Sequence, residues 1–246
     1  MLEIEDLAKN YGETQALDGA TLAFGRGTIH AILGENGSGK STLVKLLSGI
    51  VAPSRGVIRI DGEAVARFAP RTFQASGFAT VFQEVLVAPD RSVIDNILLG
   101  CDRLFTRRVP RTERRARAER ALAPIARTAI DLDAPTGSLP LAARQLIVLA
   151  RALARRPRML ILDEATAALD FADREAVFVT MENFARNGGL ILFISHRMDE
   201  VMRLAHRVTV LRNGRVVETL DRAAATSDEL LRLMAPAAAA ELSRAH

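Results

Sequence analysis

The sequence is poor in several residue types, and each shortage excludes a class of protein. Its 246 residues include one cysteine, Cys101, one tyrosine and no tryptophan. A lone cysteine excludes an internal disulfide framework and a cysteine-based metal cluster. No apolar run approaches the roughly 20 residues of a transmembrane helix, and residues 1–6 lack the basic and apolar regions of a secretory signal. We therefore expect a globular, cytoplasmic chain in which any metal is held by oxygen ligands.

Lysine is scarce as well, although the chain is basic. Of its 33 basic residues only Lys9, Lys40 and Lys45 are lysine, and the formal net charge is +4. The densest basic stretch, residues 103–120, is interleaved with glutamates and alanines and contains a single aromatic residue. This composition favours a solvated helical face over a nucleic-acid site, which would need aromatic side chains for stacking. No nucleic-acid partner is expected.

Short apolar runs alternate with segments of helical period, which predicts an α/β fold with a mostly parallel sheet. The early runs 2–7, 20–24 and 56–60 predict a small antiparallel β subdomain. Residues from about 92 to 156 are rich in Ala and Arg without a convincing strand, so they predict an inserted α-helical subdomain. One domain over residues 1–234 and a low-complexity C-terminal tail at 235–246 follow from this pattern. Core strands are predicted at 28–33, 77–82, 159–163, 190–195 and 208–211, and helices at 40–48, 170–186 and 198–206.

The strongest chemical signal is a glycine-rich run between a predicted strand and a predicted helix. Glycines let backbone N–H groups turn toward phosphates, the start of the helix adds partial positive charge, and Lys40 supplies an ammonium group. Ser41 then lies where a hydroxyl binds Mg²⁺. The alternative, a flexible glycine-rich turn, is disfavoured by the flanking strand and helix. The predicted phosphate loop comprises Gly34, Glu35, Asn36, Gly37, Ser38, Gly39, Lys40 and Ser41.

Two adjacent carboxylates follow an apolar run far downstream. Residues 159–162 have the pattern of a buried strand, and Asp163 and Glu164 come directly after it. Because open α/β sheets bind ligands at the carboxyl ends of their strands, both acids are expected near the phosphate loop. Asp163 is expected to bind Mg²⁺ and Glu164 to polarise the water that attacks a γ-phosphate. The alternative is a strand that ends in solvated acids. The two motifs together predict a site for ATP and Mg²⁺.

The order of these motifs resembles the ATP-binding cassette family over nearly the whole chain, from residue 2 to about 234. Residues 163–170 resemble the family's Walker B element and D-loop, with Ala165 where proline is usual. The resemblance implies the ABC ATPase fold around a P-loop NTPase core. It also implies that Thr42, beside Ser41, belongs to the nucleotide-binding set.

Three further residues resemble functional positions of the family. Gln83 is similar to the Q-loop glutamine, which implies contact with Mg²⁺ and a relay to a membrane subunit. His196 is similar to the switch histidine near the γ-phosphate, and Tyr11 stands where the family stacks an aromatic ring on adenine. Taken singly, each has a structural alternative: a surface glutamine, a structural histidine and an aromatic residue at the edge of the core. The resemblance implies catalytic roles for Gln83, His196 and Glu164, and it places Gln83 beside Ser41 and Asp163 as a metal ligand.

A finer resemblance is to the ATPase subunits of bacterial sugar importers of the ribose and xylose type. Residues 34–37, 79–85, 92–97 and 193–201 carry it. It implies a second cassette as partner, transmembrane permease subunits, an indirectly linked solute-binding protein, and a location on the inner face of the cell membrane. Members commonly carry two cassettes in one chain, so this sequence is expected to be half of a split pair or a fragment.

The largest departure from the family is in its signature motif, usually similar to Leu-Ser-Gly-Gly-Gln. Pro140 lacks the hydroxyl and the backbone N–H of the usual serine, and Ala142 replaces a glycine that lets a phosphate approach the backbone closely. We expect the ATP site completed by this segment of the partner to be weaker or slower than one with a full motif. With Asp170, the segment predicted at the dimer interface is Leu139, Pro140, Leu141, Ala142 and Ala143.

Two alternative functions remain compatible with the sequence. A regulatory or weakly hydrolysing cassette would fit the altered signature segment. A non-transport cassette protein that acts on DNA or the ribosome usually adds coiled insertions or charged linkers, and the sequence contains no heptad run or extended acidic tract. An importer subunit therefore stays the first prediction.

Overall fold

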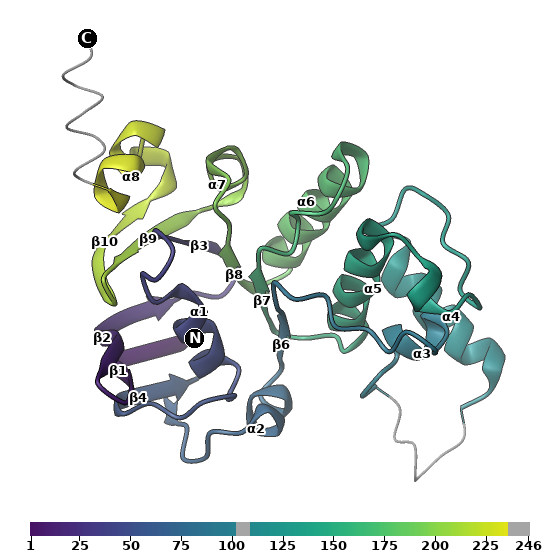
Figure 1. The fold of residues 1–246 in the computed structure, drawn as a ribbon, viewed down its shortest axis with the longest axis horizontal. Coiled ribbons are helices and arrows are strands. Elements are labelled where there is room, and N and C mark those ends of the chain that lie inside the picture. Colours follow the sequence, from purple (N-terminus) through teal and green to yellow (C-terminus); the bar gives the residue numbers. More distant parts are fainter. Residues whose placement is uncertain (102–108, 236–246) are drawn as a thin grey trace.

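The computed structural model describes residues 1–101 and 109–235. Figure 1 shows a core of two sheets with α1 between them, and an arm that consists of α3, α4 and α5. The predicted tail beyond residue 235, and residues 102–108 of the predicted Arg-rich stretch, lie outside the described residues. The α/β class predicted from the sequence is confirmed.

The larger sheet has the strand order β10-β9-β3-β8-β7-β6. Neighbouring strands from β9 to β6 pair in parallel, and β10 is antiparallel to β9. This confirms the mostly parallel sheet. The strands are β3 (Ile29–Leu33), β6 (Phe78–Val81), β7 (Met159–Asp163), β8 (Leu190–Ile194), β9 (Arg207–Arg212) and β10 (Arg215–Asp221).

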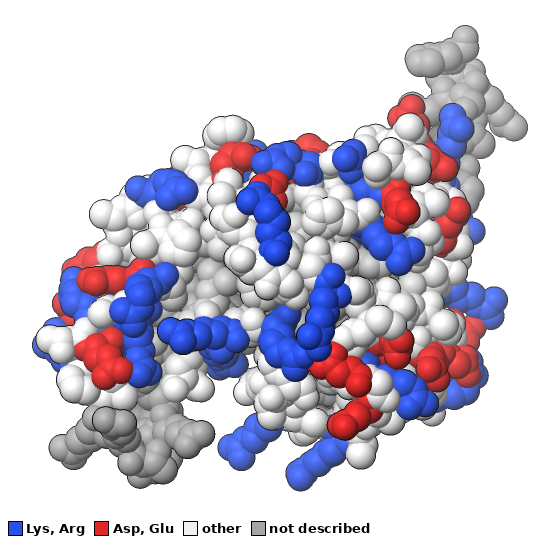
Figure 2. Space-filling model, turned by 180° about the vertical axis from the view of Figure 1, so that it is seen from behind, with Lys and Arg blue, Asp and Glu red and all other residues white. Residues whose placement is uncertain are grey.

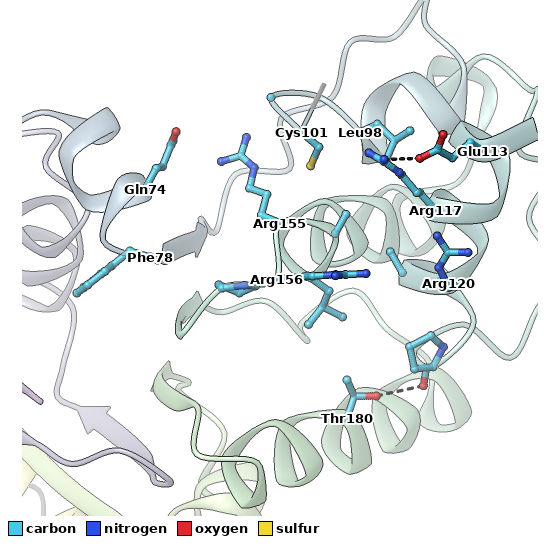
Figure 3. A pocket seen from close by; sticks show the side chains of 17 residues that line it. Gln74, Phe78, Leu98, Cys101, Glu113, Arg117, Arg120, Arg155, Arg156 and Thr180 are labelled. Atoms are coloured by element: carbon cyan, nitrogen blue, oxygen red, sulfur yellow. Dashed lines mark hydrogen bonds and ion pairs between the residues drawn. The ribbon is translucent and has the colours of Figure 1, made fainter. Parts of the chain in front are cut away.

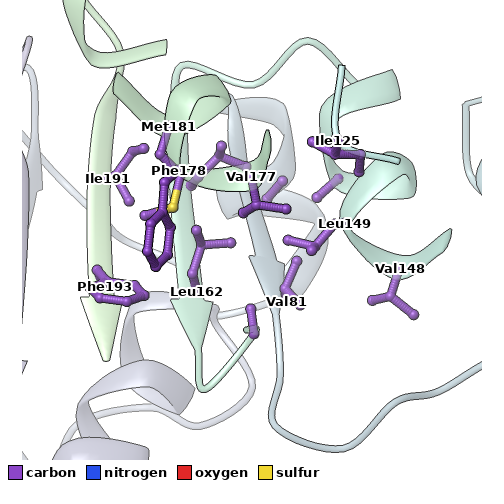
Figure 4. Packing of buried hydrophobic residues seen from close by; sticks show 14 of the residues in the cluster. Val81, Ile125, Val148, Leu149, Leu162, Val177, Phe178, Met181, Ile191 and Phe193 are labelled. Atoms are coloured by element: carbon purple, nitrogen blue, oxygen red, sulfur yellow. The ribbon is translucent and has the colours of Figure 1, made fainter. Parts of the chain in front are cut away.

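Successive side chains of the central strands point to opposite faces of the sheet, so the interior consists of two hydrophobic cores. On β8, Leu190, Leu192 and Ile194 pack toward α1 and the small sheet, whereas Ile191 and Phe193 pack on the opposite face. Figure 4 shows this second core between the sheet and the helices α5 and α6. Because both faces are covered, these strands are apolar throughout, which is why they were visible in the sequence as continuous apolar runs.

The smaller sheet has the strand order β2-β1-β4-β5 and is antiparallel, as predicted. Its first two strands are longer than the predicted runs, and shifts in their register interrupt the alternation after Ile4. Asp6, within this irregular part of β1, has a φ of 47°. The bounds are β1 (Leu2–Tyr11), β2 (Thr14–Phe24), β4 (Arg55–Ile60) and β5 (Glu63–Ala64), and α1 spans Lys40–Leu47.

The helical arm contains α3 (Val93–Ile97), α4 (Arg111–Leu122) and α5 (Leu141–Ala154), with a 3₁₀ turn at Thr136–Ser138. No strand interrupts residues 92–101 and 109–156, as predicted from the sequence. The arginines of α4 form ion pairs with acidic neighbours, among them Arg111 with Asp133 and Arg117 with Glu113. Figure 2 shows the same intermixing of basic and acidic side chains on one face of the molecule.

The remaining helices are α2 (Pro70–Ala75), α6 (Phe171–Arg186), α7 (Met198–Leu204) and α8 (Ser227–Met234). The prediction that the seventh helix reaches residue 206 is wrong. The His206 backbone N–H donates to the Ile29 carbonyl at 2.8 Å and its Nδ1 accepts from the Ile29 N–H at 2.9 Å, so the chain has already turned into β9. In the parts of the chain that the structure describes, every helix is too short or too polar to cross a bilayer.

Candidate functional site

The glycine-rich run connects β3 to α1 in a conformation that only glycine adopts without strain. Gly39 precedes the helix with a φ of 105°, in the left-handed region. A Cβ atom added to it would lie 2.7 Å from the Ala16 carbonyl oxygen, and one added to Gly34 would lie 2.3 Å from the Leu211 carbonyl oxygen. Both glycines are therefore required by the close approach of neighbouring strands. The loop therefore packs closely against β2 and β9 at these two positions.

Lys40 folds back over this loop. Its Nζ donates hydrogen bonds to the Gly34 carbonyl at 2.7 Å and to the Glu35 carbonyl at 2.8 Å. Burial lowers the pKa of the ammonium group, while Glu164 and Asp163 act in the opposite direction. The Ser38 hydroxyl is buried and has no hydrogen-bond partner within the described part of the chain. The ammonium group over this loop suits a ligand that carries anionic oxygens.

The acid pair lies where β7 ends, as predicted. Asp163 is buried, and desolvation together with the nearby Glu164 charge raises its pKa to about 6, against the influence of Lys40 and Lys45. Glu164 has a φ of 51°, and its N–H donates to the Ile194 carbonyl of the next strand at 2.9 Å. A left-handed φ in a residue other than glycine is strained and persists where surrounding contacts impose it.

Three strands bring Gln83, Glu164 and His196 together. Gln83 Nε2 donates to Glu164 Oε2 at 3.1 Å, and His196 Nδ1 lies 3.4 Å from Glu164 Oε1. These residues follow β6, β7 and β8, which are adjacent and parallel, so their carboxyl ends share one edge of the sheet. Residues separated by more than a hundred positions thus form one cluster around a single carboxylate, which argues against three unrelated surface residues.

The loop after Gln83 is anchored by two residues that the sequence reading missed. The buried Asn96 side chain accepts from the Ala88 N–H at 2.9 Å and donates to the Ala88 carbonyl at 3.0 Å. Arg151 on α5 donates to the Leu86 carbonyl at 2.9 Å and to Asn96 Oδ1 at 3.0 Å. One local signal was visible in the sequence, because Ser92 is the N-cap of α3, the helix that contains Asn96. The loop therefore connects the Glu164 cluster to the helical arm.

Tyr11 lies at the hairpin end of β1 and is 43% exposed. Lys9 Nζ is 5.3 Å from the centre of its ring. The neighbouring strand β2 begins at Thr14, and the carbonyl of its third residue, Ala16, faces Gly39. The hairpin therefore leads directly to the phosphate loop.

The signature segment lies elsewhere, at the start of α5 in the arm (Figure 1). Pro140 is the N-cap residue with φ −64° and ψ 160°, and Leu141 begins the helix with 57% of its surface exposed. Arg144 donates to the Leu139 and Gly137 carbonyls, each at 2.8 Å. The helix begins directly after Pro140, because proline tolerates an N-cap position.

Asp170 caps α6 and does not touch the Glu164 cluster through any described hydrogen bond. Its carboxylate accepts from the Asp173 N–H at 2.9 Å, which is a helix N-cap. Asp173 in turn accepts from the Arg127 N–H at 2.7 Å. Asp170 and the signature segment are therefore exposed features of this one chain, and it does not bring them into the site.

A cavity of about 850 Å³ lies between the core and the arm (Figure 3). Gln74 and Phe78 line it from the core, and Arg117, Arg155 and Arg156 line it from the arm and its connection. None of the residues predicted for nucleotide or metal binding lines this cavity. It is a separate basic hollow.

The oxygen ligands predicted for a metal suit Mg²⁺. Ser41 is exposed in the first turn of α1, and Asp163 lies at the strand end near Lys40. Mg²⁺ is usually held by one or two protein oxygens while phosphates and water complete its shell. The described residues contain no group of three or more His, Cys, Asp or Glu side chains that would form a protein-only site.

Comparison with known proteins agrees with this geometry. Residues 17–167 match the ABC transporter family. Ribose import ATP-binding protein RbsA 1 of Rhizobium johnstonii is 42% identical over 234 residues, which cover 95% of this chain and 46% of that protein. The chain thus spans about half the length of the curated relatives that it matches.

Solved structures give the same result for the fold. A dimeric ATP-binding cassette bound to ADP and phosphate has a TM-score of 0.82 at 23% identity, over 90% of this chain and 99% of that chain. An ATP-binding subunit of an ABC transporter has a TM-score of 0.81 at 26% identity, over 95% of this chain and 99% of that chain. The predicted ABC ATPase fold is confirmed. Since the family match covers more than half of its residues, the chain belongs to the ABC transporter family.

Proposed function

We propose that the chain binds Mg-ATP, hydrolyses ATP and drives an importer whose cargo is a sugar. The observation that carries the proposal is the cluster of Gln83 and His196 around Glu164, beside a phosphate loop with an unpaired buried hydroxyl. The similarity to a ribose import protein supports the cargo class.

In this proposal the loop from Gly34 to Ser41, with Thr42, binds the phosphates of ATP. Lys40 exchanges its two carbonyl contacts for phosphate oxygens, and Tyr11 stacks on the adenine ring. Ser41, Asp163 and Gln83 hold Mg²⁺, which supplies charge neutralisation at the phosphates when bound. Burial raises the pKa of Asp163, but a bound cation would offset this effect and favour the ionised carboxylate.

Glu164 is the proposed general base. Its Oε2 accepts from Gln83 and its Oε1 faces His196, so both oxygens have defined directions before a substrate binds. In such a frame a water between Glu164 and the γ-phosphate loses a proton to the carboxylate as it attacks. His196 donates toward the phosphate oxygens, where negative charge gathers in the transition state.

A second cassette is the proposed partner. Helix α5 begins with an exposed N-terminus, and Asp170 is exposed at the start of α6, so both are available to another subunit. A dimeric cassette with ADP and phosphate among the structural neighbours supports this arrangement. Closure around ATP does work when the closed pair binds the nucleotide more tightly than the open one.

Permease subunits are the proposed membrane partners, and a solute-binding protein acts through them. The loop from Gln83 to Ala88 runs from the Glu164 cluster to Asn96 and Arg151, and it continues into the arm. A partner that docks against this loop and the basic hollow beside it would sense the state of the cluster. The chain would then be held at the inner face of the membrane by its partners.

A weakly hydrolysing or regulatory cassette is the second candidate. Pro140 removes a backbone donor at the N-terminus of α5, and Arg144 is already engaged by two carbonyls. Such a chain would bind ATP normally and turn it over slowly when paired with itself.

The test is the Mg-ATPase rate of the purified chain as a function of its concentration, with ATP affinity measured in parallel. The proposed function predicts binding and a specific rate that rises with concentration. Binding without turnover at any concentration would support the second candidate. Absence of ATP binding would overturn both.

A further inference from the structure

Glu200 on α7 is a buried carboxylate that the roles above do not use. It is 1% exposed, and its Oε2 accepts hydrogen bonds from the Thr166 hydroxyl at 2.8 Å and the Ser195 hydroxyl at 2.9 Å. Its Oε1 is buried, has no hydrogen bond within the described residues, and lies 3.6 Å from Arg197 Nε. A buried carboxylate needs such partners, because an unpaired one is costly.

The partners of Glu200 belong to the two segments that carry the Glu164 cluster. Thr166 lies two residues after Glu164, and Ser195 and Arg197 flank His196 on either side. The Ser195 hydroxyl also accepts from the Arg197 N–H at 3.1 Å, so a local hydrogen bond spans the turn that contains His196. One carboxylate therefore joins both segments directly behind the 3.4 Å contact between His196 and Glu164.

Apart from the Glu164 backbone bond to Ile194 and the burial of Ala165 and Leu169, the segment after Glu164 is held by few contacts. Its neighbours Ala165, Ala167 and Ala168 have no polar side-chain groups, so Thr166 is the polar side chain that fastens residues 165–168 to α7. His196 itself is exposed, and its position depends on the turn that Ser195 and Arg197 form.

We propose that Glu200 is a positioning residue, which fixes the spacing between Glu164 and His196 by holding both of their segments on one carboxylate. The inference rests on the proposed ATPase function. Glu200 acts through Thr166 and Ser195 rather than on the reacting groups themselves. Its loss would let the two segments separate, and small misplacements of reacting groups reduce rates strongly.

The first readout is steady-state ATP hydrolysis by the full chain. Glu200→Ala is expected to lower kcat about 10–100-fold, the usual effect of removing a residue that orients catalytic groups, with a much smaller change in KM. Glu200→Gln keeps an oxygen that can accept from both hydroxyls and is expected to retain most of the rate. If Glu200→Ala does not fold, Thr166→Val removes one of the two hydroxyl contacts and replaces it in the test.

The matched control is Thr209→Val. Thr209 is fully buried and shares hydrogen bonds of 2.7 Å with His30 and with Thr219, away from the segments that Glu200 holds. This variant loses a buried polar network as Glu200→Ala does, so it should melt at a lower temperature than the unchanged chain and keep its kcat.

The second readout is the NMR signal of the histidine ring Cε1–H groups in the nucleotide-free chain, with His196 identified from a His196→Gln spectrum. Glu200→Ala should move the His196 signal and leave that of His30, and Thr209→Val should do the reverse. An unmoved His196 signal in Glu200→Ala would overturn the proposal. So would an unchanged kcat, or an equal loss of kcat in Thr209→Val. A chain without ATPase activity would contradict the proposed function alone, because the His196 signal still decides the role of Glu200.

Discussion

Helices α1 and α5 begin in contrasting ways, although both are proposed to direct an N-terminus at phosphate. Before α1 the chain passes through Gly37 and Gly39, both with positive φ, and Lys40 begins the helix. Before α5 the chain is extended at Pro140, and the exposed Leu141 occupies the first helical position. The helix dipole is common to both.

The difference teaches that a helix N-terminus is only one part of a phosphate site. At α1 the glycines open the backbone, the ammonium group is within reach, and Asp163 and Glu164 stand opposite. At α5 the nearest cation, Arg144, is bonded to two carbonyls of the preceding turn.

The largest effect on ATP turnover is expected from a substitution in the site near the start of α1. Glu164→Gln should lower ATP turnover about 10²–10⁴-fold, because general base catalysis contributes that much. ATP affinity should be retained, since the phosphate loop is untouched. Initial rates and equilibrium titrations with ATP measure both. Glu218→Gln, an exposed glutamate on β10, is the control and should match the unchanged chain.

The second largest effect is expected on ATP affinity, when the ammonium group of Lys40 is removed. Lys40→Ala should weaken ATP binding about 10–100-fold, because hydrogen bonds to charged groups contribute about 1.5–3 kcal/mol. Lys45→Ala changes an exposed lysine on the same helix and should leave affinity nearly unchanged. Calorimetric titration with ATP separates the two variants. Equal affinity in both would mean that the dipole and the backbone suffice at α1, and the contrast with α5 would lose its main element.

Restoring the usual signature residues at the start of α5 should change ATPase activity less than the two substitutions above. The double variant Pro140→Ser, Ala142→Gly adds a capping hydroxyl and a backbone N–H and allows closer approach of phosphate. We expect ATPase activity at high protein concentration to rise several-fold, in keeping with the roughly 1 kcal/mol value of a helix cap. Ala172→Gly in the first turn of α6 controls for the loss of helix propensity. Unchanged activity and unchanged ATP-driven dimer formation would contradict the expectation.

The smallest effect concerns Asp163 in the nucleotide-free chain. Its pKa of about 6 lies above the unfolded value of 3.8, so its contribution to stability is present below about pH 4 and is lost as pH rises through 6. Asp163→Asn should therefore melt several °C above the unchanged chain at pH 8, and the gap should close near pH 4. Thermal unfolding across this range measures it, and Asp228→Asn, an exposed carboxylate on α8, should show no such trend.

Local patterns predicted much of the fold and part of the site. The strands β3, β7 and β8 were visible because burial on both faces makes them apolar, and the phosphate loop because glycine spacing encodes its turn. The hairpin strand β10 was missed although Asn213 and Gly214 form a turn signal before it, with φ of 50° and 77°. Helix α8 was missed as well, although Thr226 is its cap.

The positions of Asp163, Glu164, Lys40 and the altered signature segment could be stated from the sequence, because each is a local motif whose meaning depends on its immediate neighbours. Tertiary structure decided which motifs meet. Parallel pairing of β6, β7 and β8 placed Gln83 and His196 on one carboxylate, and it left the start of α5 in a separate arm. It also placed Glu200 beneath both segments. Such contacts join residues far apart in the chain, and no local pattern records which strand ends will be neighbours.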